Sequence, residues 1–127
     1  MTEIISELEK EYYKYGKIIE APKKFLQFHT IPQHDGRAHI EYEGSDLIYV
    51  ITERGIRFNE KRTTNPDELL FWLISDLTFE IANELSINEC KTNEEYRKKL
   101  FLKQEALIGR INQEWEKQLK KYHDKLL

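Results

Sequence analysis

The feature that most constrains the fold is a helix predicted to begin near residue 65. Asn65 suits the cap position, Pro66 suits the first helical position, and Glu68 is placed to reach back to the cap. The helix is expected to run to about Asn88. The apolar residues of its first half surround most of its circumference: Leu69, Leu70, Phe71, Trp72, Leu73, Ile74, Leu77 and Phe79. Such a helix needs cover on most sides, so we expect it to be central.

Three strand-like segments precede that helix. They are Ala38 to Tyr42, Leu47 to Thr52 and Ile56 to Lys61. The pairs Gly44-Ser45 and Arg54-Gly55 between them are typical of tight turns. Alternation is clearest in the third segment, where Ile56 and Phe58 are expected to face the core and Arg57 to face water. The pattern predicts a three-stranded antiparallel meander.

Helical periodicity marks both ends of the chain. Residues 3 to 15 are expected to form a helix that Thr2 caps and Gly16 stops. Thr92 and Glu95 form a second capping pattern near the other end. One long amphipathic helix is expected to follow, with its stripe at Leu100, Gln104, Leu107, Ile111, Trp115, Leu119, Tyr122 and Leu126.

These segments predict an α+β fold with an N-terminal helix, a three-stranded antiparallel meander, and two long helices packed on the sheet. A chain of 127 residues fits one domain, so a single domain over residues 1–127 is expected. The single cysteine, Cys90, suits a reducing compartment. Because we find neither a leader segment nor an apolar run of the roughly 20 residues that span a bilayer, the expected location is the cytoplasm, away from any membrane.

Charge is unevenly distributed along the chain. The formal net charge of −3 argues against a general nucleic-acid binder, which normally carries a basic surplus. Between Asn65 and Glu89 there is no Lys or Arg, and the spacing of Asp76, Glu80 and Glu84 stacks three carboxylates on one helix face. This face is predicted to attract a basic partner.

A second interpretation of the same acidic face remains open. The last helix could lie antiparallel to it and neutralise it with Arg97, Lys98, Lys99, Lys103 and Arg110. Tyr13 is predicted to be exposed, because it lies on the opposite face of the first helix from Leu8 and Tyr12.

Catalytic and cofactor motifs are not apparent in the sequence. The four histidines match no standard metal-ligand spacing, the five glycines are scattered singly, and no nucleophile elbow is present. We therefore expect no metal, no cofactor and no catalytic residue. His39 and Glu41 lie two positions apart on one strand, so their side chains share a face and could meet. We interpret them as an exposed strand pair and not as a pair of metal ligands.

A family resemblance rests on three runs of residues. The first two are Asp35-Gly36 and Tyr49-Val50-Ile51-Thr52-Glu53-Arg54-Gly55, and the third is Pro66-Asp67-Glu68-Leu69-Leu70-Phe71-Trp72. The similarity continues through Asp76-Leu77-Thr78-Phe79-Glu80-Ile81-Ala82 and more weakly to Trp115. The chain resembles the immunity protein 63 family of bacterial polymorphic-toxin systems over roughly residues 35 to 115.

The resemblance implies a protein made beside a toxin gene that binds the toxin's C-terminal domain. That toxin could be of the LXG type, many of which end in nuclease domains. The candidate contacts are Asp76, Glu80 and Glu84, with Glu53 and Tyr13 as further candidates. A regulatory or self-associating adaptor with a large apolar patch, and a small hydrolase with clustered titratable groups in a pocket, are the alternatives.

Overall fold

The structure of the protein is a computed structural model that describes residues 2–126, with the backbone alone for Thr2. Its elements in chain order are α1 (Thr2–Ile18), β1 (Asp35–Glu43), β2 (Asp46–Glu53), β3 (Ile56–Thr63), α2 (Pro66–Ser86), α3 (Asn93–Gly109) and α4 (Gln113–Leu126). The predicted α+β class, N-terminal helix and three-stranded meander are confirmed. The prediction of two helices after the sheet is wrong, because three helices follow it.

The described residues form two compact units. The sheet unit contains the residues as far as Tyr13 together with Gln27–Leu73, and the helical unit contains Lys14–Leu26 together with the described residues from Ile74 onward. Each of the helices α1 and α2 therefore contributes residues to both units.

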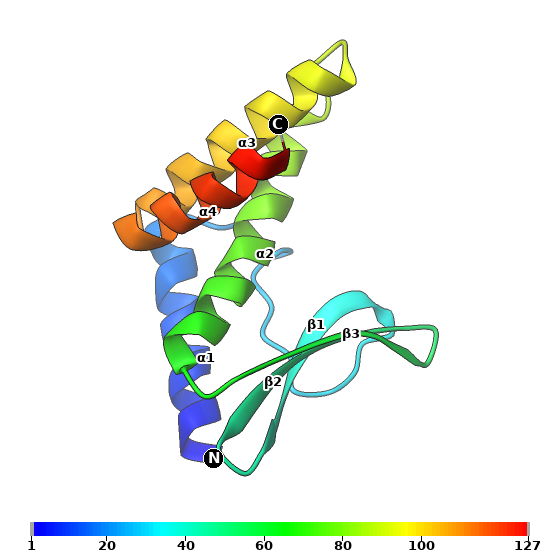
Figure 1. Cartoon of the computed structure of the whole chain (residues 1–127), viewed down its shortest axis with the longest axis vertical. Coiled ribbons are helices and arrows are strands. Elements are labelled where there is room, and N and C mark those ends of the chain that lie inside the picture. Colours follow the sequence, from blue (N-terminus) through cyan, green and yellow to red (C-terminus); the bar gives the residue numbers. More distant parts are fainter. Residues whose placement is uncertain (1, 127) are drawn as a thin grey trace. The chain divides into compact units, whose positions relative to one another are not determined.

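The sheet has the strand order β1-β2-β3, and both pairings are antiparallel, as the ribbon in Figure 1 shows. Tight two-residue turns join the strands, and the second turn holds Arg54 at φ 53° and Gly55 at φ 81°. Glycine adopts such positive φ values at no steric cost, which explains its place there. The strand positions fall within a few residues of those predicted.

The third strand contradicts the prediction for its side chains. Ile56 and Phe58 are 67% and 73% exposed, and all residues of β3 except Thr63 are exposed. β3 is an outer strand, and its register with β2 shifts between Ile51 and Thr52. Alternation predicts which side chains share a face, but it does not tell whether a second layer covers that face.

The first helix passes through the residue that was expected to stop it. Gly16 is buried and α1 continues to Ile18. A Cβ atom at Gly16 would clash with the Leu26 side chain, so this glycine permits a close approach of the following segment. The capping role predicted for Thr2 concerns a side chain outside the described part of the chain.

The predicted long last helix is divided into α3 and α4, which lie side by side in Figure 1. Asn112 starts the new helix, because its Oδ1 atom accepts hydrogen bonds from the backbone N–H groups of Glu114 (2.9 Å) and Trp115 (3.1 Å). The break resets the helical phase, so His123 is buried while Tyr122 is 59% exposed. The predicted cap at Thr92 is confirmed, since its hydroxyl accepts from the Glu95 N–H at 3.1 Å.

Each unit contains its own buried apolar residues. Those of the sheet unit are Leu8, Tyr12, Ile40, Leu47, Ile48, Tyr49, Val50, Leu69, Leu70 and Leu73. Those of the helical unit are Ile19, Ile74, Leu77, Ile81, Ala82, Leu100, Ile108, Trp115 and Leu119. The apolar first half of α2 thus supplies residues to both sets.

The helical unit also buries an ionisable pair. His123 Nδ1 lies 2.6 Å from the Glu105 carboxylate, and the two side chains are 4% and 12% exposed. The imidazole ring stacks on Phe101 with a centroid distance of 3.8 Å. This pair joins α4 to α3.

Candidate functional site

The acidic face predicted from the sequence lies on α2. The helix starts as expected, with the Asn65 Oδ1 atom accepting a hydrogen bond from the Asp67 N–H at 3.0 Å. Asp76 and Glu84 are exposed and Glu80 is half-buried. All three belong to the helical unit, so the structure brings the three main candidates together on one helix.

These carboxylates are partly engaged within the chain. Glu84 forms an ion pair with Lys24 at 2.7 Å, and both side chains are largely exposed. Asp76 and Glu80 also take part in interactions within the chain. The face is therefore negative, although its carboxylates already have partners within the chain. Lys24 lies 60 residues from Glu84 in the sequence, so no local pattern could have predicted this partner.

In the competing interpretation, basic residues of α3 neutralise the acidic segment. This applies at the C-terminal end of that segment, near Glu89. The Lys103 ammonium lies 2.9 Å from Glu89 and donates to the Leu85 carbonyl at 3.0 Å. Its hydrogen bond lowers the pKa of Glu89. Lys98 and Lys99 pair instead with Glu94 and Glu95 of their own helix.

An exposed aromatic residue lies beside the acidic face. Phe79 is 44% exposed and follows Asp76 by three positions, which places the two side chains on neighbouring parts of the helix surface. Sequence reasoning assigned Phe79 to the buried half of the helix. Exposed aromatic side chains with charged neighbours are frequent anchors at protein interfaces.

The two further candidates lie in the other unit. Tyr13 is 39% exposed, which confirms its predicted exposure, and its ring packs edge-on against Tyr12 with a centroid distance of 5.5 Å. Glu53 is exposed at the end of β2, where it pairs in register with Ile56. Glu53 therefore lies beside an exposed apolar side chain. Neither residue belongs to the unit that contains the acidic face.

A charged network crosses one face of the sheet. Glu41 accepts hydrogen bonds from Arg57 (2.9 Å) and from the ring of His39 (2.7 Å). Arg57 also contacts Glu60, which in turn contacts Arg62. Arg62 then reaches Glu43 and Asp46, both at 3.4 Å. The pairing of His39 with Glu41 that the strand alternation suggested is therefore present, but the arginines that extend it were missed.

The network affects the ionisation of its central carboxylate. The hydrogen bond from Arg57, and then the one from His39, lower the pKa of Glu41 below its ordinary value. Glu41 therefore stays ionised at neutral pH and is a weak base. His39 is fully buried, and its Nδ1 atom has no hydrogen-bond partner among the described residues. The network is suited to attracting a cationic group.

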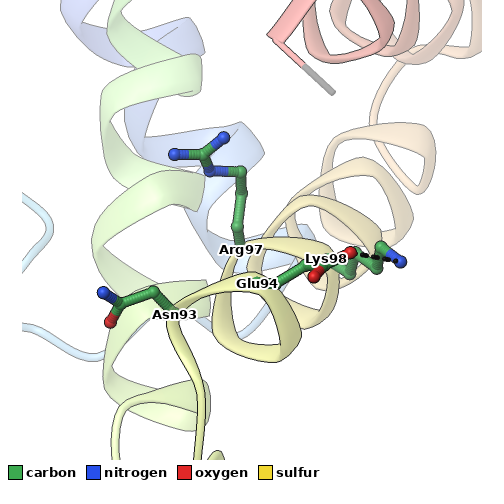
Figure 2. A pocket seen from close by; sticks show the side chains of 4 residues that line it. All are labelled: Asn93, Glu94, Arg97 and Lys98. Atoms are coloured by element: carbon green, nitrogen blue, oxygen red, sulfur yellow. Dashed lines mark ion pairs between the residues drawn. The ribbon is translucent and has the colours of Figure 1, made fainter.

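A pocket also lies at the start of α3, lined by Asn93, Glu94, Arg97 and Lys98. Figure 2 shows Lys98 paired with Glu94, while Arg97 points in a different direction. Arg97 donates to the carbonyl of Leu126 at 3.3 Å. Three of the four side chains thus contact one another or the last turn of α4, which is a structural role.

Residues 2–126 do not provide the features of two other classes of site. Within that range no group of three or more His, Cys, Asp or Glu side chains is arranged to hold a metal ion. None of the described helices is both long and apolar enough to cross a membrane.

Comparisons with known proteins supply the family. The sequence model of the family described as immunity protein 63 matches residues 43–125, which include most of the sheet and all of α2 and α3. No curated protein and no solved structure matches the chain. The match extends further toward the C-terminus than the resemblance described above, which ended near residue 115. The general role of such proteins is to neutralise a toxin. The chain belongs to the immunity protein 63 family.

Proposed function

We propose that this protein neutralises a cognate bacterial toxin of a polymorphic-toxin system by direct, stoichiometric binding. The inhibitor covers or distorts the toxin's C-terminal domain and carries out no reaction of its own. The protein acts in the cytoplasm of the producing cell, where it protects that cell and its kin. The whole chain acts as one immunity domain, a reading supported by the continuity of α1 and α2 through both units.

The observation that carries this proposal is the face of α2, which lies inside the family match. Asp76, Glu80 and Glu84 line it, and Phe79 provides an exposed apolar anchor. A negative surface increases the rate at which a positively charged partner arrives and selects its orientation. An aromatic side chain that becomes buried slows dissociation.

The partner favoured by this chemistry is a basic toxin domain. Nucleases bind a polyanion and commonly carry basic surfaces for that purpose, so a nuclease-type toxin fits the acidic face of α2. Glu53 and Tyr13 are proposed as additional contacts from the sheet unit.

Co-expression with the toxin domain encoded immediately upstream tests the proposal. We expect growth of the host to be rescued and a stable complex to co-purify. Rescue without a complex would contradict neutralisation by direct binding. Absence of both rescue and complex would reduce the family membership to a shared fold.

Charge reversal tests the assigned surface. The variant Asp76→Lys, Glu80→Lys, Glu84→Lys should reduce the association rate about 10- to 100-fold at low salt, with a smaller effect at high salt. A matched variant with the same charge change elsewhere is Glu7→Lys, Glu9→Lys, Asp124→Lys, since these three side chains are exposed. Equal effects of the two variants would show that net charge matters and the α2 face does not.

A milder variant guards against misfolding. Because Glu80 is half-buried, its reversal could unfold the chain, so Asp76→Asn, Glu80→Gln, Glu84→Gln is made in parallel. This variant keeps the side-chain shapes and should show the same direction of change with a smaller size. Unchanged association by this folded variant would remove α2 from the interface.

A further inference from the structure

The outer edge of β1 is only partly covered. Glu43 and Asp46 close a two-residue hairpin, so their backbone groups bond to each other across the strands. In an antiparallel pair, successive residues alternately direct their backbone N–H and C=O groups toward the partner strand and away from it. Ile40 and Tyr42 must therefore direct these groups away from β2. The Ile40 N–H indeed donates to the His29 carbonyl at 2.9 Å.

The segment that contains His29 covers the outer edge of β1 at Ile40 but does not reach Tyr42. Among residues 2–126, no backbone hydrogen bond reaches the outward groups of Tyr42, two residues beyond Ile40. The chain's own segment at His29 thus shows that this edge accepts an additional extended piece, and that the piece stops short of Tyr42.

A groove lies where the coverage stops. It has a volume of about 480 Å³ and is lined by Ile5, Thr30, Ile40, Glu41 and Tyr42. Its walls are mainly apolar, and Tyr42 is 51% exposed. A free strand edge beside an apolar groove is the arrangement that proteins use to bind an extended peptide as an extra strand.

The charges next to the groove select the occupant. Glu41 and Glu43 extend from β1 on the face opposite to Ile40 and Tyr42. Together with Asp46 and Glu60 they share two guanidinium groups, those of Arg57 and Arg62. The network therefore has more negative than positive charge, and Glu43 is the most exposed of its carboxylates, with 73% of the side chain accessible.

We propose that this groove binds an extended segment of the toxin as an added strand on β1. The segment alternates apolar side chains, which enter the groove beside Ile40 and Tyr42, with Lys or Arg side chains, which meet Glu41 and Glu43. The inference rests on the proposed toxin-binding function and adds the location and chemistry of a second contact. The free edge is short, so the segment is about three or four residues long.

A proline substitution at Tyr42 separates the backbone contact from the side chain. Tyr42→Pro removes the outward N–H, and proline is tolerated on an edge strand where that N–H faces solvent. Tyr42→Ala removes the same ring and keeps the N–H. In the complex with the toxin domain, we expect Tyr42→Pro to weaken affinity about tenfold more than Tyr42→Ala, the loss of a well-placed hydrogen bond.

Amide exchange provides a readout that a folding defect would not imitate. In the wild-type complex the Tyr42 amide should gain protection against hydrogen exchange, while the amides of Glu41 and Glu43 are already protected in the free protein. Thr30→Trp, at an exposed position of the opposite wall, fills the groove and should weaken binding even if Tyr42→Pro does not fold.

The outcomes are distinguishable. If the wild-type protein binds the toxin, but Thr30→Trp binds equally well and the Tyr42 amide is unchanged, the added-strand contact is wrong and the proposed function stands. If the wild-type protein does not bind the toxin at all, the proposed function fails and this inference fails with it.

Discussion

The two units of this protein hold charged side chains in opposite ways. The sheet unit spreads Glu41, Arg57 and their neighbours over one face of the sheet, where the guanidinium groups stay nearly half exposed. The helical unit instead encloses one pair, Glu105 and His123, almost completely. The difference separates two uses of charge, because an exposed network can meet a partner and an enclosed pair can only hold helices together.

The energetics of the two arrangements differ accordingly. An exposed ion pair contributes little to stability, because water and salt screen it and because ordering long side chains costs entropy. An enclosed pair contributes little compared with apolar residues of the same shape, but the removal of one partner leaves the other buried without compensation. Single substitutions should therefore have large effects in the helical unit and small effects in the sheet unit.

The largest effect is expected for His123→Leu. It leaves the Glu105 carboxylate buried without its hydrogen-bond donor and should lower the free energy of unfolding by about 3–5 kcal/mol. Urea unfolding followed by circular dichroism measures this. The double variant Glu105→Leu, His123→Leu should recover most of the loss. A single variant within about 1 kcal/mol of wild type would refute the contrast between the units.

A smaller effect is expected at the turn between β2 and β3, where conformation and not charge is decisive. Gly55 has a φ of 81°, and open space surrounds the position of a Cβ atom. Gly55→Ala should lower the free energy of unfolding by about 1–2 kcal/mol, because an alanine pays for the left-handed conformation. Gly55→Asn should cost clearly less, since asparagine tolerates positive φ. Equal losses in both variants would point to a cause other than φ.

The smallest effect is expected in the sheet network. Glu41→Gln should lower the free energy of unfolding by at most about 1 kcal/mol at pH 7. The pKa of Glu41 is lower in the folded protein than its ordinary value of 4.5, so its stabilising effect is present above that value. The effect disappears as the pH falls through the folded-state pKa. Unfolding curves from pH 7 to pH 3 test this, and a wild-type advantage that grew toward low pH would contradict it.

Local patterns predicted much of the fold. Asn65 with Pro66 marked the start of α2, and Thr92 marked the start of α3, because a helix cap depends on neighbouring residues alone. The break at Asn112 could also have been predicted. Gly109 is a residue type that often ends a helix, and Asn112 is a residue type that often caps the start of the next one. It was missed because the apolar stripe could be continued across it.

Features that depend on distant residues were not predictable. The partnership of Lys24 with Glu84, and the register shift opposite Ile51, require knowledge of which segments meet. The acidic face of α2 could be recognised from its spacing, but the exposure of Phe79 beside it could not. The groove beside Tyr42 is formed by three separate segments, and no run of sequence indicates it.

The exposure of the outer strand β3 has a consequence for the unbound protein. A strand that shows Ile56 and Phe58 to solvent is a template on which other chains could stack. Here the Asn59 Oδ1 atom accepts a hydrogen bond from the Glu60 N–H at 2.8 Å. The shifted register bends the strand beside this bond. The outer edge of β3 therefore displays apolar side chains, while the Asn59 side chain engages one of its backbone N–H groups, which makes that position less able to pair with another chain.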